Sequence, residues 1–347
     1  MFDVVGTSNS EVVEIPLELS VSDGIAAAVV LTSPADNAMN QSVSPNFAWG
    51  AATGAITYLL EVATDSGFND IVISQPTSEV TLDAPAPLLS STTYYWRITA
   101  SNGCGVSSPS QTFSFITIAA PGDCSIDQVA NVLYEYDFES GLNGWSSTSN
   151  LNPAGSDLWS ESGVNANSGT TSMLAVDVAN VSDQLLTSPP VLIPADEIPI
   201  SMSFWNRQVI EDNVDGTICW DGGFLEVSID NGANFTYVTT DKMLTDPYDA
   251  IIDDSFSNPA ANTEAWCGDP QDWLNSIVDF NDYAGETVMF RFRMATDSSI
   301  SHEGWYIDDV RVQSCVTPQS ICDAPPPVGD KDIIWFNGFQ CVEEPTP

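Results

Sequence analysis

Side chains that could act as a nucleophile or a general base are scarce in this chain. His302, in the segment SHEGWY, is the only histidine among 347 residues. The sequence contains no His-Glu-x-x-His, Gly-x-Ser-x-Gly or Walker motif. A glycosidase would need a pair of carboxylates, but 48 acidic residues offer so many pairs that none stands out. The sequence therefore predicts no catalytic residue.

Acidic side chains dominate the charge. The chain has 48 Asp and Glu residues against 7 Lys and Arg, a net charge of −41. Such a chain repels nucleic acid and anionic lipid, because binding to either depends on basic residues. Carboxylates and backbone carbonyls are the ligands that Ca²⁺ prefers. The composition thus favours either a calcium site or a generally acidic secreted protein without a particular cation.

Cysteine usage and apolar runs bear on the compartment. Seven cysteines without a Cys-x-x-Cys pair indicate disulfides, and hence a secreted protein, rather than zinc. The apolar run GIAAAVVL is far shorter than the roughly 20 residues that cross a membrane, so no membrane insertion is expected. Residues 1–28 are typical of the terminal strands of a truncated preceding β-domain, and we expect a catalytic domain upstream.

Residues 29–118 hold short alternating segments such as ITYLLEVATD and TTYYWRITASN, which predict a β-sandwich. They resemble a fibronectin type III domain, in which Trp49 stands at the place of the family's core tryptophan. The segment LLSSTTYYWRITA matches the family's tyrosine-corner pattern through Leu88, Tyr94, Arg97 and Ala100. The resemblance implies a fold and no chemistry.

Residues 124–315 carry seven motifs in order, among them YDFESGLNGW, DGGFLEVSIDNGANFTYV and EGWYIDDVRV. Their order resembles the MAM-like jelly-roll domain that lies behind the catalytic domain in secreted immune-inhibitor-A-type metallopeptidases and other bacterial proteases. The resemblance implies a second, larger β-sandwich, so the chain is expected to be all-β. It also implies a bacterial, extracellular, peptidase-associated region.

Jelly-roll binding modules of related architecture hold a structural calcium ion between their first and last strands, and the resemblance implies such a site here. Their ligands are a Glu after a Phe on the first strand, carbonyls of a Ser-Gly-x-x-Ser loop, and an Asp in a Tyr-Ile-Asp-Asp-Val strand. The matching positions are Glu139, the SGTTS loop that begins at Ser168, and Asp308, with Asp137 and Asp309 as second choices. The alternative is that these carboxylates are solvated or accept hydrogen bonds from backbone amides.

The segment SIDNGANF, residues 228–235, has the form of the Asp box that recurs in sialidase propellers. It occurs once, whereas a propeller would need it in every blade. Asn231 and Gly232 supply the positive φ that a tight turn requires, so the segment predicts a hairpin. We expect Ser228 and Asp230 to bind amides of the turn.

Cysteine positions predict three disulfides. Cys219 and Cys267 both fall in long loops of the jelly roll and are expected to pair. Cys124 and Cys315 flank its first and last strands, which are neighbours if the calcium interpretation holds. Cys104 and Cys124 are expected roughly 30 Å apart, far beyond the roughly 7 Å that a disulfide spans, so Cys104 is the odd thiol. The proline-rich, acidic residues 316–347 predict a short irregular tail pinned by a bond between Cys322 and Cys341.

The sequence favours a non-catalytic accessory region of a secreted multidomain hydrolase, with a peptidase as the preferred partner. Five tryptophans could form a platform for an extracellular protein or a glycan, although most tryptophans belong to cores. These are Trp145, Trp159, Trp220, Trp266 and Trp273. Two other functions stay open: a cell-surface adhesin or structural protein without an enzyme, and a glycan-active enzyme.

Overall fold

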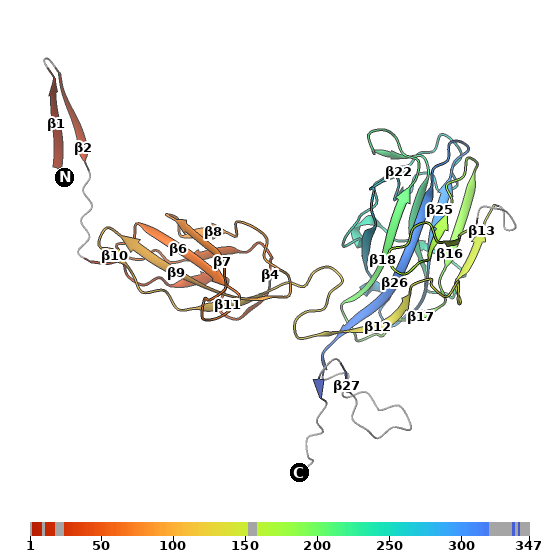
Figure 1. The fold of residues 1–347 in the computed structure, drawn as a ribbon, viewed down its shortest axis with the longest axis horizontal. Helices are drawn as coiled ribbons and strands as arrows, with labels where there is room; N and C mark the ends of the chain where they lie inside the picture. Colours follow the sequence, from red (N-terminus) through yellow and green to blue (C-terminus); the bar gives the residue numbers. More distant parts are fainter. Residues whose placement is uncertain are drawn as a thin grey trace, which may run out of the picture. The chain divides into compact units, whose positions relative to one another are not determined.

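The computed structural model describes residues 2–8, 11–17, 24–151, 158–318, 335–336 and 339–340. Within these ranges the regular elements are strands, apart from two single turns of 3-10 helix at Thr240–Lys242 and Asn281–Tyr283 (Figure 1). The all-β class is therefore confirmed. The chain divides into two compact units, Met1–Ala119 and Ala120–Pro347. In the described part of the chain, no helix is long and apolar enough to cross a membrane.

Two short strand pairs lie near the ends of the chain. Strand β1 (Phe2–Ser8) runs antiparallel to β2 (Glu11–Leu17) along its whole length. Strand β27 (Trp335–Phe336) pairs with β28 (Phe339–Gln340). The cysteines expected to pin the tail, Cys322 and Cys341, lie outside the described residues, so that bond stays a prediction.

The smaller unit contains a sheet with strand order β4-β11-β9-β6-β7, with β10 beside β9, and a second sheet with order β3-β5-β8. The strands are β3 (Leu31–Ser33), β4 (Ala38–Gln41), β5 (Asn46–Trp49), β6 (Thr57–Ala63), β7 (Ile71–Thr77), β8 (Thr81–Asp83), β9 (Thr93–Asn102), β10 (Gly105–Val106) and β11 (Phe113–Thr117). Alternation along β6 buries Tyr58, Leu60 and Val62, as the sequence pattern predicts.

The tryptophan and tyrosine singled out in this unit belong to its core. Trp49 is buried against Tyr58, and Tyr94 is buried with its hydroxyl accepting a hydrogen bond from the Leu89 N–H at 3.0 Å. Both residues therefore have a structural role. The fibronectin type III assignment itself stays a prediction.

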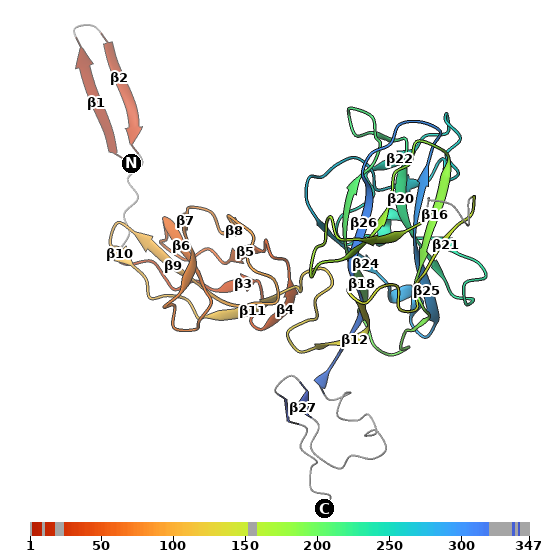
Figure 2. The ribbon, with the colours of Figure 1, turned by 45° about the vertical axis from the view of Figure 1, so that its right-hand side comes forward.

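The larger unit consists of two main sheets, visible as two sets of long arrows in Figures 1 and 2. The first has strand order β14-β15-β26-β18-β24, with β12 beside β26. Its strands are β12 (Val129–Tyr136), β14 (Ser160–Ser162), β15 (Ser172–Ala175), β18 (Ile200–Val209), β24 (Leu274–Asp279) and β26 (Gly304–Val316). We call it the groove sheet, because its outer face carries the groove described below.

The second sheet has strand order β13-β16-β25-β20-β21, with β17 beside β25. Its strands are β13 (Ser146–Ser149), β16 (Ser182–Thr187), β17 (Val191–Leu192), β20 (Gly222–Ser228), β21 (Thr236–Tyr237) and β25 (Thr287–Thr296). A smaller sheet is formed by β19 (Ile218–Cys219), β22 (Ala250–Ile252) and β23 (Glu264–Ala265).

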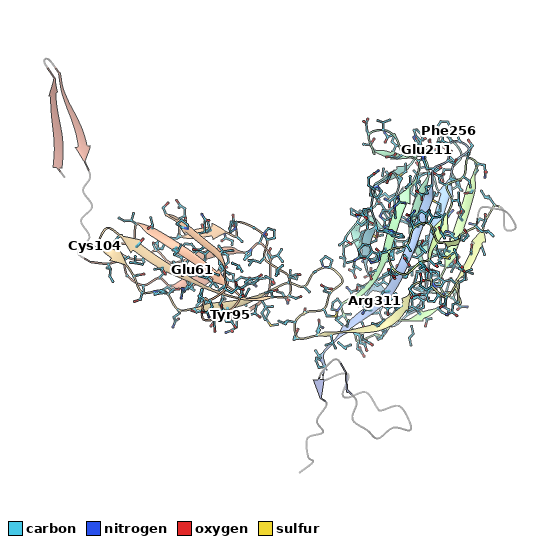
Figure 3. The ribbon with its side chains drawn as sticks, in the orientation of Figure 1. Glu61, Tyr95, Cys104, Glu211, Phe256 and Arg311 are labelled. Carbon is cyan, nitrogen blue, oxygen red and sulfur yellow. A yellow bond between two sulfur atoms is a disulfide. The ribbon has the colours of Figure 1, made fainter. Side chains whose placement is uncertain are left out.

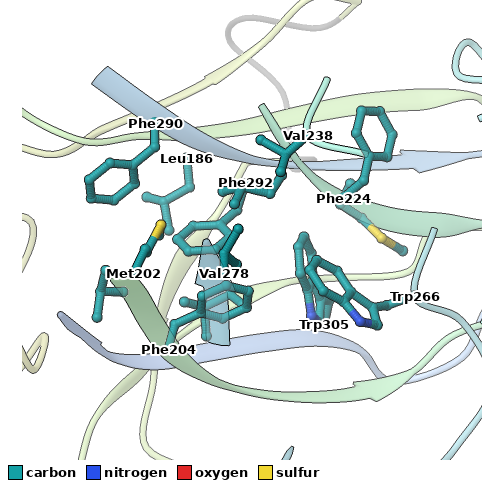
Figure 4. Packing of buried hydrophobic residues seen from close by; sticks show 14 of the residues in the cluster. Leu186, Met202, Phe204, Phe224, Val238, Trp266, Val278, Phe290, Phe292 and Trp305 are labelled. Carbon is teal, nitrogen blue, oxygen red and sulfur yellow. The ribbon is translucent and has the colours of Figure 1, made fainter. Parts of the chain in front are cut away.

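An aromatic core joins the two main sheets (Figure 4). Phe204 of β18 meets Phe292 of β25 with ring centroids 4.8 Å apart, and Trp266 meets Trp305 at 5.7 Å. All four side chains are fully buried. Because burial of aromatic surface stabilises a fold in proportion to its area, this cluster is the main structural support of the larger unit.

Two disulfides close the larger unit. Cys124 is bonded to Cys315, and Cys219 is bonded to Cys267. The first bond links the segment before β12 to the end of β26, two strands that pair with each other. Neither bond includes Cys104, which is exposed. The larger unit thus contains the two disulfides that the cysteine positions predict for it.

Candidate ligand groove and metal centre

A groove of about 560 Å³ lies on the outer face of the groove sheet. Its floor comes from β12, β18, β24 and β26, and its lining includes Glu135, Tyr136, Ser203, Trp205, Asn275 and Arg311. Trp205 is half-buried, because alternation along β18 turns Phe204 into the core and the next side chain outward. The groove therefore presents the indole of Trp205 and the ring of Tyr136 among hydrogen-bonding side chains.

The polar groups of the groove are only partly engaged with each other. Arg311 Nη1 lies 3.5 Å from Glu135 Oε1, a long ion pair, and within the described residues Arg311 Nε has no hydrogen-bond partner. The Tyr136 hydroxyl donates to the Gly141 carbonyl at 2.6 Å. The groove thus keeps both donor and acceptor capacity for a ligand. Figure 3 labels Arg311 on this sheet.

Three residues of the expected calcium site, Asp137, Ser168 and Asp309, also line the groove. The register between β18 and β26 shifts between Ser203 and Trp205, which places an extra residue in β26 at this point. As a result Asp308 is fully buried while Asp309, with φ 47°, stays partly exposed. The bulge therefore settles which of the two neighbouring aspartates of β26 is buried, a choice that the sequence left open.

The expected ligands do converge on one loop, residues 165–171, but the carboxylates contact its backbone N–H groups rather than its carbonyl oxygens. Asp308 Oδ2 accepts hydrogen bonds from the N–H groups of Asn167 at 2.8 Å and Ser168 at 3.3 Å. The exposed Glu139 accepts from the N–H groups of Thr170 at 2.8 Å and Thr171 at 2.6 Å. These amides lower the pKa of Glu139. The geometry fits the alternative named from the sequence, in which amides satisfy the carboxylates, and calcium at this place stays a prediction.

The two second-choice carboxylates also bind protein groups. Asp309 accepts from the Ser168 hydroxyl at 2.7 Å and from Asn167 Nδ2 at 2.8 Å. Asp137 Oδ1 accepts from the Glu139 N–H at 3.1 Å. Burial, with the neighbouring Asp309 charge, raises the pKa of Asp308 to about 6. The loop is therefore tied to β26 through side chains and backbone together.

Three of the five tryptophans considered for a ligand platform are core residues, which is the alternative that the sequence favoured. Trp145, Trp159 and Trp266 are 5%, 3% and 0% exposed and belong to the core of the larger unit. Trp220 and Trp273 are half-buried and do not line the groove. The tryptophan that does line it, Trp205, was missed, although its outward place in the alternating segment ISMSFWNRQV was a usable signal.

Sequence reasoning also missed a group of buried carboxylates at one end of the sandwich. Glu211, Asp221 and Asp297 each offer an oxygen, and these oxygens lie within 4.8 Å of one another. The three side chains are 7%, 0% and 2% exposed, and Asp177, 1% exposed, lies beside them. Figure 3 labels Glu211 at the upper end of the larger unit. This group, with Asp177, is called the acidic cluster below, and a metal ion could be held there.

Burial dominates the electrostatics of the acidic cluster. It raises the pKa of Asp221 to about 10, with the neighbouring Asp177 as the next cause. Burial also raises the pKa of Glu211 and of Asp177. No Lys or Arg forms an ion pair with any of the four among the described residues. Four carboxylates so placed need protons or a cation to be stable.

The two other features singled out from the sequence are His302 and the hairpin. His302 is exposed in the loop before β26, and its charge opposes the rise that burial causes in the pKa of Asp177 and Glu211. In the hairpin, Ser228 Oγ accepts from the Gly232 N–H at 2.9 Å, and Asp230 Oδ1 accepts from the Asn234 N–H at 2.8 Å. Asn231 and Gly232 have φ values of 58° and 82°. The predicted turn chemistry is confirmed.

Comparisons with known proteins give limited relationships. No family model matches this chain. A 43-residue segment is 40% identical to Bacillopeptidase F of Bacillus subtilis (strain 168) and spans 12% of this chain and 3% of that protein. This chain therefore matches only a small part of that relative.

Among solved structures, the chain is similar to the carbohydrate-binding module TmCBM61 in complex with β-1,4-galactotriose. That match has 14% identity and a TM-score of 0.32, and it covers 51% of this chain and 92% of the module. The carbohydrate-binding module TmCBM27, which recognises mannan, matches with 12% identity and a TM-score of 0.27 over 54% of this chain and 98% of the module. Values this low support no conclusion about a ligand.

Proposed function

We propose that this chain is a secreted, non-catalytic binding region whose larger unit holds a neutral oligosaccharide in the groove. The observation that carries the proposal is the placement of Trp205 beside Arg311, Glu135 and Asn275 on one open sheet face. An indole face can cover the apolar C–H face of a sugar ring, and the polar side chains can bind its hydroxyls.

The charge of the groove selects among ligand classes. Glu135, Asp137 and Asp309 stand against the single cation Arg311. A sulfated or uronic sugar would bring further negative charge to a chain whose formal net charge is already −41. A neutral glycan avoids this repulsion, and its hydroxyls can both donate to carboxylates and accept from the partly exposed guanidinium of Arg311.

The proposal includes an association with a hydrolase, preferably a peptidase. The resemblance of residues 124–315 to the MAM-like domain of secreted proteases supports it, as does the short similarity to Bacillopeptidase F. It also retains a structural calcium ion between Glu139 and Asp308. An adhesin without an enzyme remains the second candidate, since the same groove would serve cell adhesion.

The test is titration of the full chain with a panel of neutral oligosaccharides by calorimetry. We expect at least one to bind. We also expect Trp205→Ala to weaken that binding at least tenfold, because the packing of the indole on the C–H face of the sugar ring is lost. Trp273→Ala, which removes a half-buried indole outside the groove, serves as the matched control and should bind as wild type.

Three results would contradict the proposal. They are no binding across the panel, equal binding by Trp205→Ala, and preferential binding of a basic peptide. Turnover of the bound sugar that is lost on mutation of a single groove carboxylate would instead support a glycan-active enzyme.

A further inference from the structure

The acidic cluster is assembled from the ends of four strands that belong to both main sheets. Asp177 and Glu211 each follow a strand of the groove sheet, β15 and β18, by two residues. Asp221 directly precedes β20, and Asp297 directly follows β25, both in the second sheet. Each strand therefore brings a carboxylate to the same end of the sandwich.

In Asp221 and in Asp177, one carboxylate oxygen accepts a hydrogen bond from a backbone N–H group and the other oxygen has no donor. Asp221 Oδ1 accepts from the Asp297 N–H at 2.5 Å, and Asp177 Oδ2 accepts from the Glu211 N–H at 3.3 Å. In the described part of the chain, Asp221 Oδ2, Asp177 Oδ1 and Glu211 Oε2 are buried with no hydrogen-bond partner. A buried acceptor without a donor costs about 1–3 kcal/mol, and more if it is charged. A proton shared by the facing carboxyls of Asp177 and Asp221 would satisfy two of the three oxygens and leave Glu211 Oε2 without a partner, whereas a cation would satisfy all three.

The fourth carboxylate is oriented in the same way. Asp297 Oδ1 accepts from the Ser299 N–H at 2.7 Å and from the Ser299 hydroxyl at 3.3 Å. The cluster contains oxygen ligands alone, whereas zinc sites are built mostly from His and Cys. Oxygens within 4.8 Å of one another can all touch a single Ca²⁺, because two opposed Ca–O bonds of roughly 2.4 Å span about that distance.

We propose that Glu211, Asp221 and Asp297, with Asp177 beside them, bind one Ca²⁺ that joins the two main sheets. This site is separate from the loop contacted by Glu139 and Asp308, and it does not depend on the sugar-binding proposal. Because its ligands come from four strand ends, the folded state binds the ion and the unfolded chain does not, so calcium stabilises the larger unit.

The rival explanation for the same geometry is a proton shared by Asp177 and Asp221 with no metal. The two explanations differ in what Asp221→Asn does. If a proton satisfies the pair, an amide replaces it with little loss of stability, and Asp221→Asn binds as much calcium as the wild-type chain. If calcium is the ligand, the substitution removes a charged oxygen and weakens binding.

The experiment measures ⁴⁵Ca²⁺ binding and thermal unfolding of the full chain after chelator treatment and dialysis. We expect a bound equivalent that Glu211→Gln and Asp221→Asn each lose and that Glu139→Gln and the exposed control Glu286→Gln retain. At free calcium about a hundred times Kd, the melting temperature of the wild-type larger unit should rise by roughly 5–10 °C. An equal ionic strength of NaCl should not reproduce that rise.

The proposal is overturned if the wild-type chain binds no calcium at millimolar concentration. It is also overturned if Glu211→Gln and Asp221→Asn keep the bound equivalent, or if only Glu139→Gln loses it. Should Glu211→Gln fail to fold by circular dichroism, Asp297→Asn takes its place.

Discussion

At the scale of single residues, the pKa values of the aspartates in this chain differ widely with their surroundings. Asp230 is exposed in the hairpin, and hydrogen bonds from Asn234 and Ser228 lower its pKa to about 2. Burial raises the pKa of Asp249 to about 6 and that of Asp221 to about 10. The net charge of −41 is therefore a formal count, and burial and hydrogen bonding shift individual aspartates in opposite directions.

Asp249 allows a direct test of that effect. Its carboxylate accepts from the Cys267 N–H at 3.0 Å and from Gln208 Nε2 at 3.2 Å, yet burial outweighs these bonds and raises its pKa. An aspartate has an unfolded pKa of about 3.9. Between pH 4 and 6 the folded state therefore holds more protons than the unfolded state. This residue's contribution to the free energy of unfolding must fall as pH rises through that window.

We predict that Asp249→Asn is more stable than wild type at pH 8 by about 1–3 kcal/mol, because an amide oxygen keeps the bonds without the charge. The advantage should shrink as pH falls from 6 to 4. Urea unfolding of both proteins at pH 4 and pH 8 measures it. A difference that does not change with pH, or a variant less stable at pH 8, would show that Asp249 is charged at little cost.

At the scale of elements, alternation along single strands was readable from the sequence and contacts between distant strand ends were not. The segment SIDNGANF predicted its turn because Ser228, Asp230 and Asn234 interact within a few residues. The acidic cluster joins residues from four separate strand ends, so no local spacing shows it. One signal was available: Asp221 directly precedes β20, whose seven residues are all buried, an unusual place for a carboxylate.

The expected calcium ligands show a different limit. The sequence placed Glu139, Asp308 and the SGTTS loop together, and the structure brings them together. It could not show that the loop turns its amides toward the carboxylates, since that depends on backbone conformation rather than on residue type. The bulge at Asp309 did leave a signal, because the core side chains of β26 change phase from Trp305 and Ile307 to Val310 and Val312 across it.

The glycine pair that opens β20 explains why that strand can approach its neighbours so closely. A Cβ atom on Gly223 would lie 2.4 Å from Cε3 of Trp305, and one on Gly222 would lie 2.6 Å from the Ala265 Cβ. Neither distance is possible without movement. We predict that Gly223→Ala destabilises the larger unit by about 1–3 kcal/mol, because the buried indole of Trp305 must shift within a filled core.

Gly163→Ala is the matched control for this substitution. Its Cβ would lie 3.6 Å from the Thr170 carbonyl oxygen, an ordinary contact, so its free energy of unfolding should stay within about 0.5 kcal/mol of wild type. Chemical denaturation of the two variants gives both values. Equal stabilities for Gly223→Ala and Gly163→Ala would mean that the close approach to Trp305 is not required.

At the scale of the whole molecule, the described residues form two hydrophobic cores with no buried residue in common. Phe47, Trp96 and Phe115 belong to the core of the smaller unit, and Phe204 and Phe292 to that of the larger. Each cluster is lined by residues of its own unit alone. We infer that the two units unfold independently, so that a calcium effect on the larger unit should leave the smaller one unchanged.

The segment between the units provides the last prediction. Residues 118–121 lie in no strand, and Pro121 is exposed. Gly122 is held by the larger unit, since its carbonyl accepts from Gln313 Nε2 at 2.6 Å, and Cys124 is bonded to Cys315.

A broad-specificity protease such as subtilisin should therefore cut before Gly122. Trypsin should not cut in this segment, because no Lys or Arg occurs between Arg97 and Arg207. A cut at 118–121 releases the smaller unit on a gel without reductant, whereas a cut after Cys124 leaves the two pieces joined until the disulfide is reduced. Release only after reduction, or resistance to subtilisin under conditions that degrade an unfolded chain, would contradict independent units with an open connection.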